Sequence, residues 1–590
     1  MTSPTFGKIY FMRLNVLVLF LFPIFLGSCG SGPKSPEQTA TDDAGKTVLY
    51  FNGDIITMEG DSANYVEALL VKNGVIRFAG SRVEAEKQAG GSPRLVDLKG
   101  KTLLPGFIDG HSHITKYADG LFQADFNPPP IGKVNNIPDI ITALQELKKK
   151  LKASDTDWLA GNGYDQEMLA EKRHPTAADL DAAFPTNPVV LGHASGHMLV
   201  ANSAALRKAG ITAQTPDPHG GTIIRIKGGK EPEGLVQEMA QTVFFPFLLK
   251  PMPMDVEMKK IRDAQAYYAS CGVTTGAEHL ALPEKMALLD SAANRGDLFI
   301  DLTVLPAFIH AKEYVGTGKI KWAEYRNHLK YAGLKMAVDG SPQGKTAFLS
   351  KPYHTPVPGC SHDCKGFPNL TQDQVNELVL LCYRNNVQLF SHCNGDASID
   401  MMIKGHEQAV KILGDSTTDR RTVIIHSQIM RPDQLSAYRR YRMFPSFFTN
   451  HAYYWGDAHV ANLGMERAGF ISPMRSAMNM GIRCSNHTDC TVTPMDQLFL
   501  MWTAVNRLSR SGVLIGGDER ISPYQALRSL TIDAAYEYFE EQKKGSLATG
   551  KLADLVILDK NPLKADVMKI KDIKVLETIK EGKSIYSRKD

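Results

Sequence analysis

Short apolar segments alternate with amphipathic helical segments along most of this 590-residue chain. Such an alternation is typical of parallel β-strands joined by crossover helices. We expect strands near residues 104–110, 188–193, 273–278, 300–306, 333–338, 387–391, 422–427, 443–448 and 481–486. An eight-stranded α/β barrel needs one strand fewer, so one of these segments belongs elsewhere.

The segment at 188–193 is the outlier. It lies in a stretch of about 150 residues between the first and third candidates, far longer than one crossover helix requires. We therefore expect a (β/α)8 TIM-like barrel built from residues 104–116 and 263–539. The stretch 117–262 is then an insertion domain after the first barrel strand.

Both ends of the body carry signs of a second, smaller β domain. Asn52-Gly53 and Asn73-Gly74 lie beside β-prone residues, and Asn-Gly is the strongest short-range hairpin signal. Residues 555–558 and 573–586 also read as short strands. Residues 47–103 and 540–590 are therefore expected to form one small β-sandwich.

The first residues have the order of a secretory signal peptide. Lys8 and Arg13 precede an apolar run from Val16 to Leu26, which is too short for a bilayer that needs about 20 residues. Leu26-Gly27-Ser28-Cys29 resembles a bacterial lipoprotein lipobox, in which Cys29 is lipidated after removal of residues 1–28; an incidental cysteine in a core helix is the alternative. Residues 29–46 read as a flexible tether. We expect an envelope protein, anchored by lipid to the outer membrane and facing the periplasm.

Size and charge restrict the remaining partners. The chain is far longer than a peptide-sized binding module, and its net charge is +4 without any dense basic run. Nucleic acid is therefore excluded as an expected partner, which leaves a small-molecule substrate and, through Cys29, the membrane. The sequence leaves the oligomeric state open. Cys360 and Cys364 lie in one Gly/Pro-flanked loop, where an oxidising compartment would permit a disulfide; a small metal site using His362 is the alternative.

Metal-ligating side chains recur where the expected strands end. His111 and His113 follow the first strand at a spacing of two, which sends both imidazoles to one face where they can share a metal ion. Chemistry in α/β barrels assembles at the carboxyl ends of the strands. Later strands supply more such side chains: Lys335, His392, His426 and Asp489. Taken singly, these residues could be exposed loop histidines, core histidines bonded to the backbone, or, for Asp489, a helix cap.

This ordered set resembles the amidohydrolase superfamily, and more narrowly the family 3 branch that includes N-substituted formamide deformylases. The resemblance rests on the stretches 105–109, 196–206, 272–275, 335–341, 426–428 and 550–555, and it covers nearly all of residues 48–585. It implies a metal-dependent hydrolase of carbon–nitrogen bonds other than peptide bonds.

The resemblance also implies how the ligands are shared. His111, His113 and Asp489 would hold one divalent ion, and His392 and His426 a second, with zinc the expected metal. Lys335 has no lone pair to give as an ammonium ion. Burial would favour its neutral amine, and the binuclear members of the superfamily imply a carbamate of Lys335 that bridges the ions. An unmodified Lys335, paired with Asp339 or touching substrate, is the alternative.

The sequence gives weaker evidence for the residues that bind substrate than for the metal ligands. Candidates for binding substrate are His193, His197, Asp339, Gln428, His451 and Trp455. The histidines at 193 and 197 would equally serve to stabilise the insertion domain, and the aromatic residues to pack. His487 shares strand parity with Asp489, which makes it a candidate partner of the metal centre.

The expected mechanism assigns one catalytic proton carrier. Asp489 takes a proton as metal-activated hydroxide attacks an amide, formamide or cyclic amide carbonyl, and returns it to the leaving nitrogen. A deaminase or an ester or lactone hydrolase would use the same metal centre. A catalytically silent, lipid-anchored binding protein is the alternative from another class.

Overall fold

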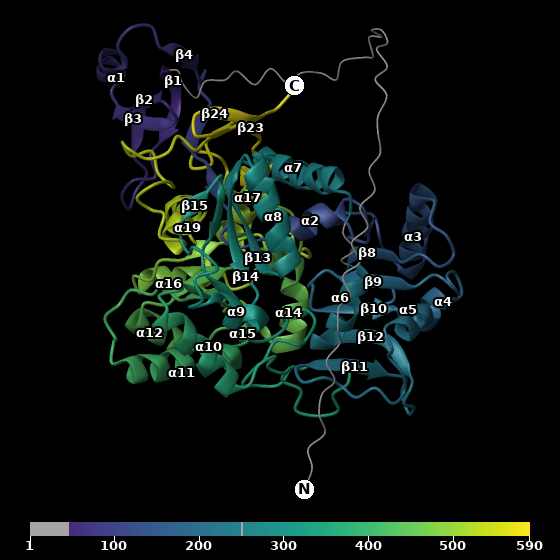
Figure 1. The fold of residues 1–590 in the computed structure, drawn as a ribbon. Helices are drawn as coiled ribbons and strands as arrows, with labels where there is room; N and C mark the ends of the chain where they lie inside the picture. The colour runs from purple at the N-terminus through teal and green to yellow at the C-terminus, as the bar shows by residue number, and fades with distance from the viewer. Residues whose placement is uncertain (1–46, 249–251, 590) are drawn as a thin grey trace, which may run out of the picture. The chain divides into compact units, whose positions relative to one another are not determined.

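The computed structural model describes residues 47–248 and 252–589. The predicted signal sequence, Cys29 and nearly all of the tether lie outside these residues. In the described part, strands from both ends of the chain form one eight-stranded sheet in the order β24-β23-β22-β5-β1-β2-β3, with β4 paired to β1 (Figure 1). Its strands are β1 (Thr47–Ile56), β2 (Tyr65–Lys72), β3 (Val75–Gly80), β4 (Arg94–Asp97), β5 (Thr102–Pro105), β22 (Leu555–Leu558), β23 (Val575–Lys580) and β24 (Lys583–Ser587). The two-layered sandwich form and the domain boundaries stay predictions.

The two Asn-Gly pairs have different roles in this sheet. Asn73-Gly74 forms the turn between the antiparallel strands β2 and β3, which confirms that hairpin. The hairpin expected at Asn52-Gly53 is wrong, because both residues lie inside β1. There the register shifts between Phe51 and Ile55, and Asn52 has a φ of 60°. The irregularity marks the place where β1 changes its parallel neighbour from β4 to β5.

Eight parallel strands lie at the predicted barrel positions. They are β6 (Phe107–Ile108), β13 (Val273–Ala281), β14 (Asp301–Pro306), β17 (Leu334–Ala337), β18 (Leu389–Cys393), β19 (Val423–His426), β20 (Phe444–Phe447) and β21 (Ser485–Asn486). The first three pair in one sheet and the last five in another, and the parallel bridges Ala307–Lys335 and Ser112–Cys490 link the two sheets. The fold is thus an α/β fold of the TIM-barrel type.

The expected first strand at 104–110 is two strands. Residues before Gly106 pair with β22 in the terminal sheet, and residues after it pair with β13 among the barrel strands. A Cβ on Gly106 would lie 2.4 Å from Thr274 Cγ2, so the packing of the Thr274 side chain against this backbone favours glycine. The apolar pattern runs through Gly106 without a break, which is why one continuous strand is expected from the sequence.

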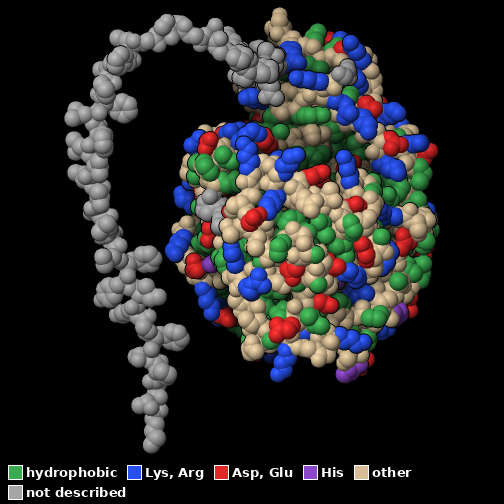
Figure 2. All heavy atoms as spheres, turned by 90° about the vertical axis from the view of Figure 1, so that its right-hand side faces the viewer, with side chains coloured by type: hydrophobic (Ala, Val, Ile, Leu, Met, Phe, Trp, Pro, Cys, Tyr) green, Lys and Arg blue, Asp and Glu red, His purple; other side chains and the backbone are tan. Residues whose placement is uncertain are grey.

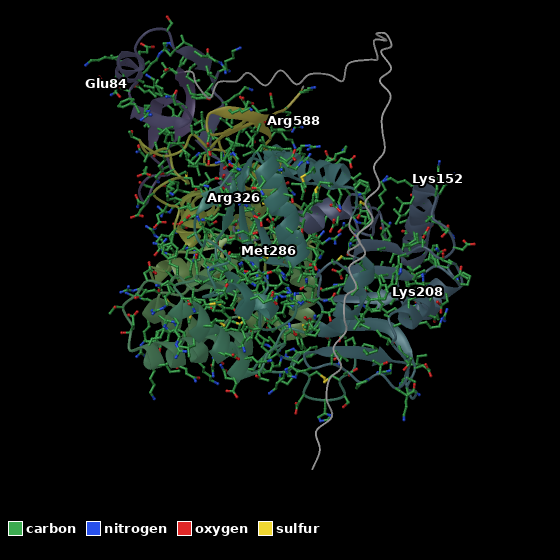
Figure 3. All side chains as sticks on the ribbon, in the orientation of Figure 1. Glu84, Lys152, Lys208, Met286, Arg326 and Arg588 are labelled. Atoms are coloured by element: carbon green, nitrogen blue, oxygen red, sulfur yellow. A yellow bond between two sulfur atoms is a disulfide. The ribbon has the colours of Figure 1, made fainter. Side chains whose placement is uncertain are left out.

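The outlying segment at 188–193 does lie outside the barrel strands. It corresponds to β9 (Val189–His193) in a six-stranded sheet of order β11-β12-β10-β9-β8-β7. The other strands are β7 (Ala124–Asp125), β8 (Leu159–Tyr164), β10 (Met198–Ala201), β11 (Gly221–Arg225) and β12 (Pro232–Glu238). This sheet has its own apolar core around Leu144, Leu159 and Leu191. Lys152 and Lys208 mark this part of the molecule in Figure 3.

Helices connect and cover these sheets. In chain order they are α1 (Arg82–Ala89), α2 (Ile114–Gly120), α3 (Ile137–Leu151), α4 (Ala177–Asp181), α5 (Ser203–Lys208), α6 (Phe245–Leu248), α7 (Met254–Ser270), α8 (Pro283–Arg295), α9 (Ala311–Tyr314), α10 (Gln372–Arg384), α11 (Asp396–Leu413), α12 (Pro432–Tyr441), α13 (Asn450–Tyr454), α14 (Gly456–Leu463), α15 (Met465–Gly469), α16 (Met474–Asn479), α17 (Gln497–Asn506), α18 (Pro523–Ser529) and α19 (Ile532–Glu537). Two short strands, β15 (Tyr325–Arg326) and β16 (Leu329–Tyr331), extend the sheet next to β14.

Sequence signals explain where typical helices begin and end. Thr371 caps α10 in a reciprocal capping box with Gln374, and Gly414 ends α11 in the left-handed conformation. Among the described residues, none of the helices combines the length and hydropathy of a membrane span. On the face shown in Figure 2, basic and acidic side chains are interspersed, in keeping with the near-neutral composition.

Candidate metal centre

The predicted metal ligands gather at the carboxyl ends of the barrel strands. His111 follows β6, His392 lies near the end of β18, His426 ends β19, and Asp489 follows β21. All four side chains are buried. His426 and Asp489 also have left-handed backbone conformations, with φ values of 71° and 51°. Non-glycine residues in this region are strained, and such strain clusters at functional sites.

Two imidazoles converge on one carboxylate oxygen. The Nε2 atoms of His111 and His113 lie 3.1 and 3.4 Å from Oδ1 of Asp489, an oxygen that has no well-formed hydrogen bond among the described residues. Burial and the neighbouring Lys335 lower the pKa of His111 well below its usual value. Burial alone would raise the pKa of Asp489, but His111 and His113 hold it well below its usual range. The site therefore presents a neutral imidazole at His111 and an ionised carboxylate at Asp489.

A hydrogen-bond chain sets the tautomer of His111. The hydroxyl of Tyr538 donates to the carbonyl of Gly110 at 2.6 Å, so its oxygen accepts from Nε2 of His279 at 2.9 Å. His279 Nδ1 then carries a lone pair, and Nδ1–H of His111 donates to it at 2.5 Å. Nε2 of His111 is left as a lone pair that faces Asp489.

His113 is oriented in the same manner. Its Nδ1 lies 3.0 Å from the carbonyl oxygen of His279, and a carbonyl only accepts. Nδ1 therefore carries a proton, which leaves Nε2, the atom that faces Asp489, as the ring nitrogen placed to bind a metal. Such outer partners fix ring orientation and ligand basicity in metal sites.

His279 is a functional residue that the sequence prediction missed. It lies near the end of β13 with the same strand parity as Thr275 and Ala277, so its position at a barrel strand end was visible in the chain. Tyr538, its partner on the other side, is 259 residues further along. No local sequence pattern predicts the contact between His279 and Tyr538.

His426 and His487 form a second pair beside Asp489. Nε2 of His426 lies 3.9 Å from Oδ2 of Asp489, and Nδ1 of His426 lies 3.1 Å from Nε2 of His487. Burial lowers the pKa of His487 to about 3, so its ring is neutral. Ligand atoms of His111, His426, His487 and Asp489 all lie within 4.8 Å of one another. The structure thus places His487, expected as a partner of the centre, directly against a predicted ligand.

Lys335 is buried on β17 next to these histidines. Its Nζ lies 3.5 Å from Nδ1 of His279, and no ion pair of Lys335 is found among the described residues. Burial lowers the pKa of Lys335 to about 7. The alternative pairing with Asp339 is not formed, because that carboxylate accepts hydrogen bonds from the backbone of Phe348, Asn394 and Gly395.

His392 lies at the edge of the cluster. Its Nδ1 is 3.4 Å from Oδ1 of Asp339 and its Nε2 is 3.1 Å from Nδ2 of Asn394. Its ring centre is 4.6 Å from that of His426 and 4.8 Å from that of His197. His392 is near the predicted ligands but outside the tight group of four.

The remaining substrate-binding candidates divide into two kinds. His193 uses both ring nitrogens on Ser195 and Gln166, His451 bonds His459, and the Trp455 indole donates to Asp165. These side chains are engaged in holding loops together, and Asp339 likewise organises the loop after β18.

The two remaining candidates are His197 and Gln428. His197 reaches from the insertion sheet to pair with Glu238 at 2.8 Å, and although burial lowers its pKa, Glu238 raises it overall. Gln428 is fully buried, and neither amide atom has a hydrogen-bond partner among the described residues. A buried amide without partners is costly, so Gln428 is suited to contact a ligand.

A cavity of about 330 Å³ adjoins the centre. Its wall includes Cys490 and Thr491, which follow Asp489 directly, together with Tyr117, Tyr267 and His193. The volume suits a small organic molecule. Cys360 and Cys364, in a loop elsewhere, are joined in a disulfide.

The residues present fit a divalent ion. Neutral imidazoles and a carboxylate are the donor set that zinc and similar ions prefer. The buried Oδ1 of Asp489, faced by two ring nitrogens without a well-formed hydrogen bond, is an acceptor that an ion would satisfy. Fold and site together define a metal-dependent hydrolase.

Comparison with known proteins agrees with this class. A model described as the amidohydrolase family matches residues 94–586, and the chain belongs to that family, whose members hydrolyse carbon–nitrogen bonds. The chain is 26% identical over 565 residues to an N-substituted formamide deformylase of Arthrobacter pascens, covering 92% of this chain and 99% of the relative. It is 28% identical over 559 residues to the protein LONG AFTER FAR-RED 3 of Arabidopsis thaliana, covering 91% of each chain.

A solved structure shows the same fold. An uncharacterized metal-dependent hydrolase from Pyrococcus horikoshii OT3 matches with a TM-score of 0.68 at 23% identity, covering 88% of this chain and 99% of that chain. Family and residue cluster together support a divalent metal in this protein.

Proposed function

We propose that this enzyme hydrolyses amide, formamide or cyclic amide substrates with two zinc ions at the ends of a closed eight-stranded barrel. The observation that carries the proposal is the convergence of His111 and His113 on one oxygen of Asp489. The similarity to a protein named N-substituted formamide deformylase supports an amide-type substrate. The insertion domain at 117–262 and the sandwich from both ends complete the proposed architecture.

His111, His113 and Asp489 would hold one ion, and His392 and His426 the other. Ions in such a site polarise the substrate carbonyl and make water nucleophilic near neutral pH. The chain's own contribution is orientation: Tyr538 and His279 fix the tautomer of His111, and the backbone carbonyl of His279 fixes that of His113.

Lys335 would act as a carbamate between the ions. Its burial and its lack of an ion pair among the described residues favour the neutral amine, which is the form that adds carbon dioxide. Burial lowers the pKa of the neighbouring His279 well below its usual value, so that this ring is neutral as well. Asp339, engaged with backbone N–H groups, does not compete for Lys335.

Asp489 is the proposed proton carrier. Its carboxylate is ionised and lies at the junction of the two histidine groups. From that place it accepts a proton from the attacking water at Oδ and delivers it to the leaving nitrogen.

The Asp489→Asn variant tests this role. Loss of a general acid–base group costs roughly 10²- to 10⁴-fold in kcat, measured on a panel of N-formyl, N-acyl and cyclic amides at saturating metal. The exposed Asp518→Asn variant is the control for a lost carboxylate. Full activity of Asp489→Asn with bound metal would refute the role. Less than one equivalent of tightly bound metal in the wild type would instead favour a binding protein.

We also propose that Cys29 carries the lipid anchor, in the outer membrane and facing the periplasm. The order of basic residues, apolar run, small residues and cysteine supports this placement.

A further inference from the structure

The cavity beside the metal centre has largely apolar walls, one lysine and one carboxylate, Asp125, which accepts hydrogen bonds from the backbone and side chain of Asn127. Tyr117, Leu121, Ile131 and Tyr267 supply the apolar surface. Among the described residues that line it, Lys116 is the one lysine or arginine. Polar groups that are few and well placed are what give orientation to a ligand in an apolar pocket.

Lys116 lies on the side of α2 that faces the metal centre. It is three residues after His113, so the two side chains are neighbours on one helical face. The His113 side chain is 24% exposed, whereas that of His111 is 2% exposed, so the centre is open on the side of His113. Across the cavity, a Cβ on Gly196 would lie only 2.9 Å from Nζ of Lys116.

The ammonium group of Lys116 has no partner in the described part of the chain. The nearby carboxylate of Asp119 is occupied by Lys260 and Lys285. That of Glu278 accepts from the backbone and hydroxyl of Thr115. Burial lowers the pKa of Lys116, and the charges of Asp489 and Glu278 offset this only in part. A ligand anion bonded directly to the ammonium group would stabilise its charged form.

We propose that Lys116 binds a carboxylate on the substrate, so that the enzyme acts on N-formyl or N-acyl amino acids with an apolar side chain. The proposal rests on the proposed amide hydrolysis and names its substrate class. One lysine supplies a single positive charge and lacks the planar, bidentate guanidinium group of arginine. Its ammonium group therefore matches a monoanionic carboxylate better than a phosphate. The distance of one helical turn from His113 places the carboxylate a few bonds from the scissile bond, and the tyrosines receive the apolar side chain.

Paired substrates test the proposal. N-formyl-L-phenylalanine carries the carboxylate, and the primary amide N-formyl-L-phenylalaninamide has a neutral group of similar size in its place. We expect the ratio of their kcat/KM values to fall roughly 10- to 100-fold in Lys116→Met, mainly through KM, as for a lost hydrogen bond to a charged group. Lys116→Arg should recover part of the ratio. The control Lys149→Met, on the exposed side of α3, should keep it. An unchanged ratio in Lys116→Met would overturn the proposal.

A binding measurement separates this inference from the proposed function. The dissociation constant of N-formyl-L-phenylalanine is measured by calorimetry on metal-loaded Asp489→Asn protein, with Lys116 or with Met at that position. If the wild type hydrolyses none of the N-formyl, N-acyl and cyclic amides in the panel, the proposed function fails, but a tenfold or greater loss of affinity on Lys116→Met still supports the carboxylate site. Equal affinities, or no binding to the protein that retains Lys116, would contradict it.

Discussion

At the scale of single residues, the metal centre depends on side chains that never need to touch a metal. The hydrogen bonds that run from the Gly110 carbonyl through Tyr538 and His279 leave His111 with its Nε2 lone pair toward Asp489. Without these hydrogen bonds, the His111 ring would be free to point an N–H group toward Asp489. His279 is therefore a positioning residue for the proposed first ion.

Replacing His279 by glutamine should weaken metal binding. Partners of metal ligands typically account for 10- to 100-fold in affinity, and we expect a loss of about that size in a competition titration against a chelator. Tyr538→Phe, which leaves the His279 ring in place but removes the hydroxyl, should cause a smaller loss. The surface variant His310→Gln serves as the control. Wild-type metal affinity in both His279→Gln and Tyr538→Phe would contradict the positioning role.

The residues predicted for the centre share one visible property, which is their place at the ends of apolar segments. His111, His392, His426 and Asp489 could be found because a strand pattern precedes each of them. His279 also ends a strand, but a lone histidine is more often a core residue, and its partner is 259 residues away. Contacts of that range are fixed by the tertiary arrangement of the strands and cannot be predicted from local sequence.

At the scale of elements, the division of one expected strand at Gly106 shows that hydrophobic periodicity does not predict which neighbouring strand a segment pairs with. Alternation and apolar character predicted one strand, and the structure has two because β22 and β13 compete for successive parts of the segment. The same limit explains Asn52-Gly53. A turn signal does not close a hairpin when the neighbouring strands β4 and β5 pair with both sides of it.

Gly106→Ala should destabilise the fold. The added methyl group would lie 2.4 Å from Thr274 Cγ2 and 2.5 Å from its Oγ1, so Thr274 or the backbone at Gly106 must shift. Overpacking of this kind costs about 1–3 kcal/mol in the free energy of unfolding, measured by urea denaturation. Gly229→Ala, whose Cβ would lie 3.6 Å from the nearest atom, should stay close to the wild type. Equal stability of the two variants would show that position 106 tolerates a side chain.

At the scale of the whole molecule, barrel strands and the sheet from both ends make one hydrolase body. Lys580 on β23 ties the two sheets together, since its ammonium group pairs with Asp301 on β14 and with Asp554 before β22. The order of segments along the chain predicted where most of these strands lie, except that the expected strand at 104–110 is divided between the two sheets. It could not predict ion pairs between segments nearly 280 residues apart, such as Lys580 with Asp301.

The proposed anchor makes a prediction for the intact protein in a bacterial host. Cys29→Ser removes the only thiol that the lipobox-like motif would offer for lipid attachment. We expect incorporation of labelled palmitate to disappear, and the protein to leave the outer-membrane fraction. Cys271→Ser, at a cysteine outside the motif, should retain both properties. Labelling that persists in Cys29→Ser would contradict the anchor.

The terminal sheet has a consequence for biosynthesis. Strand β5, which leads directly into the first barrel strand, has β1 on one side and β22 on the other. The second neighbour is translated some 450 residues after β5 itself, so β5 keeps an unpaired edge while nearly the whole chain emerges from the ribosome. Pairings of such long separation form late and expose aggregation-prone edges meanwhile. A nascent chain of this protein thus exposes that strand edge until its last strands are made.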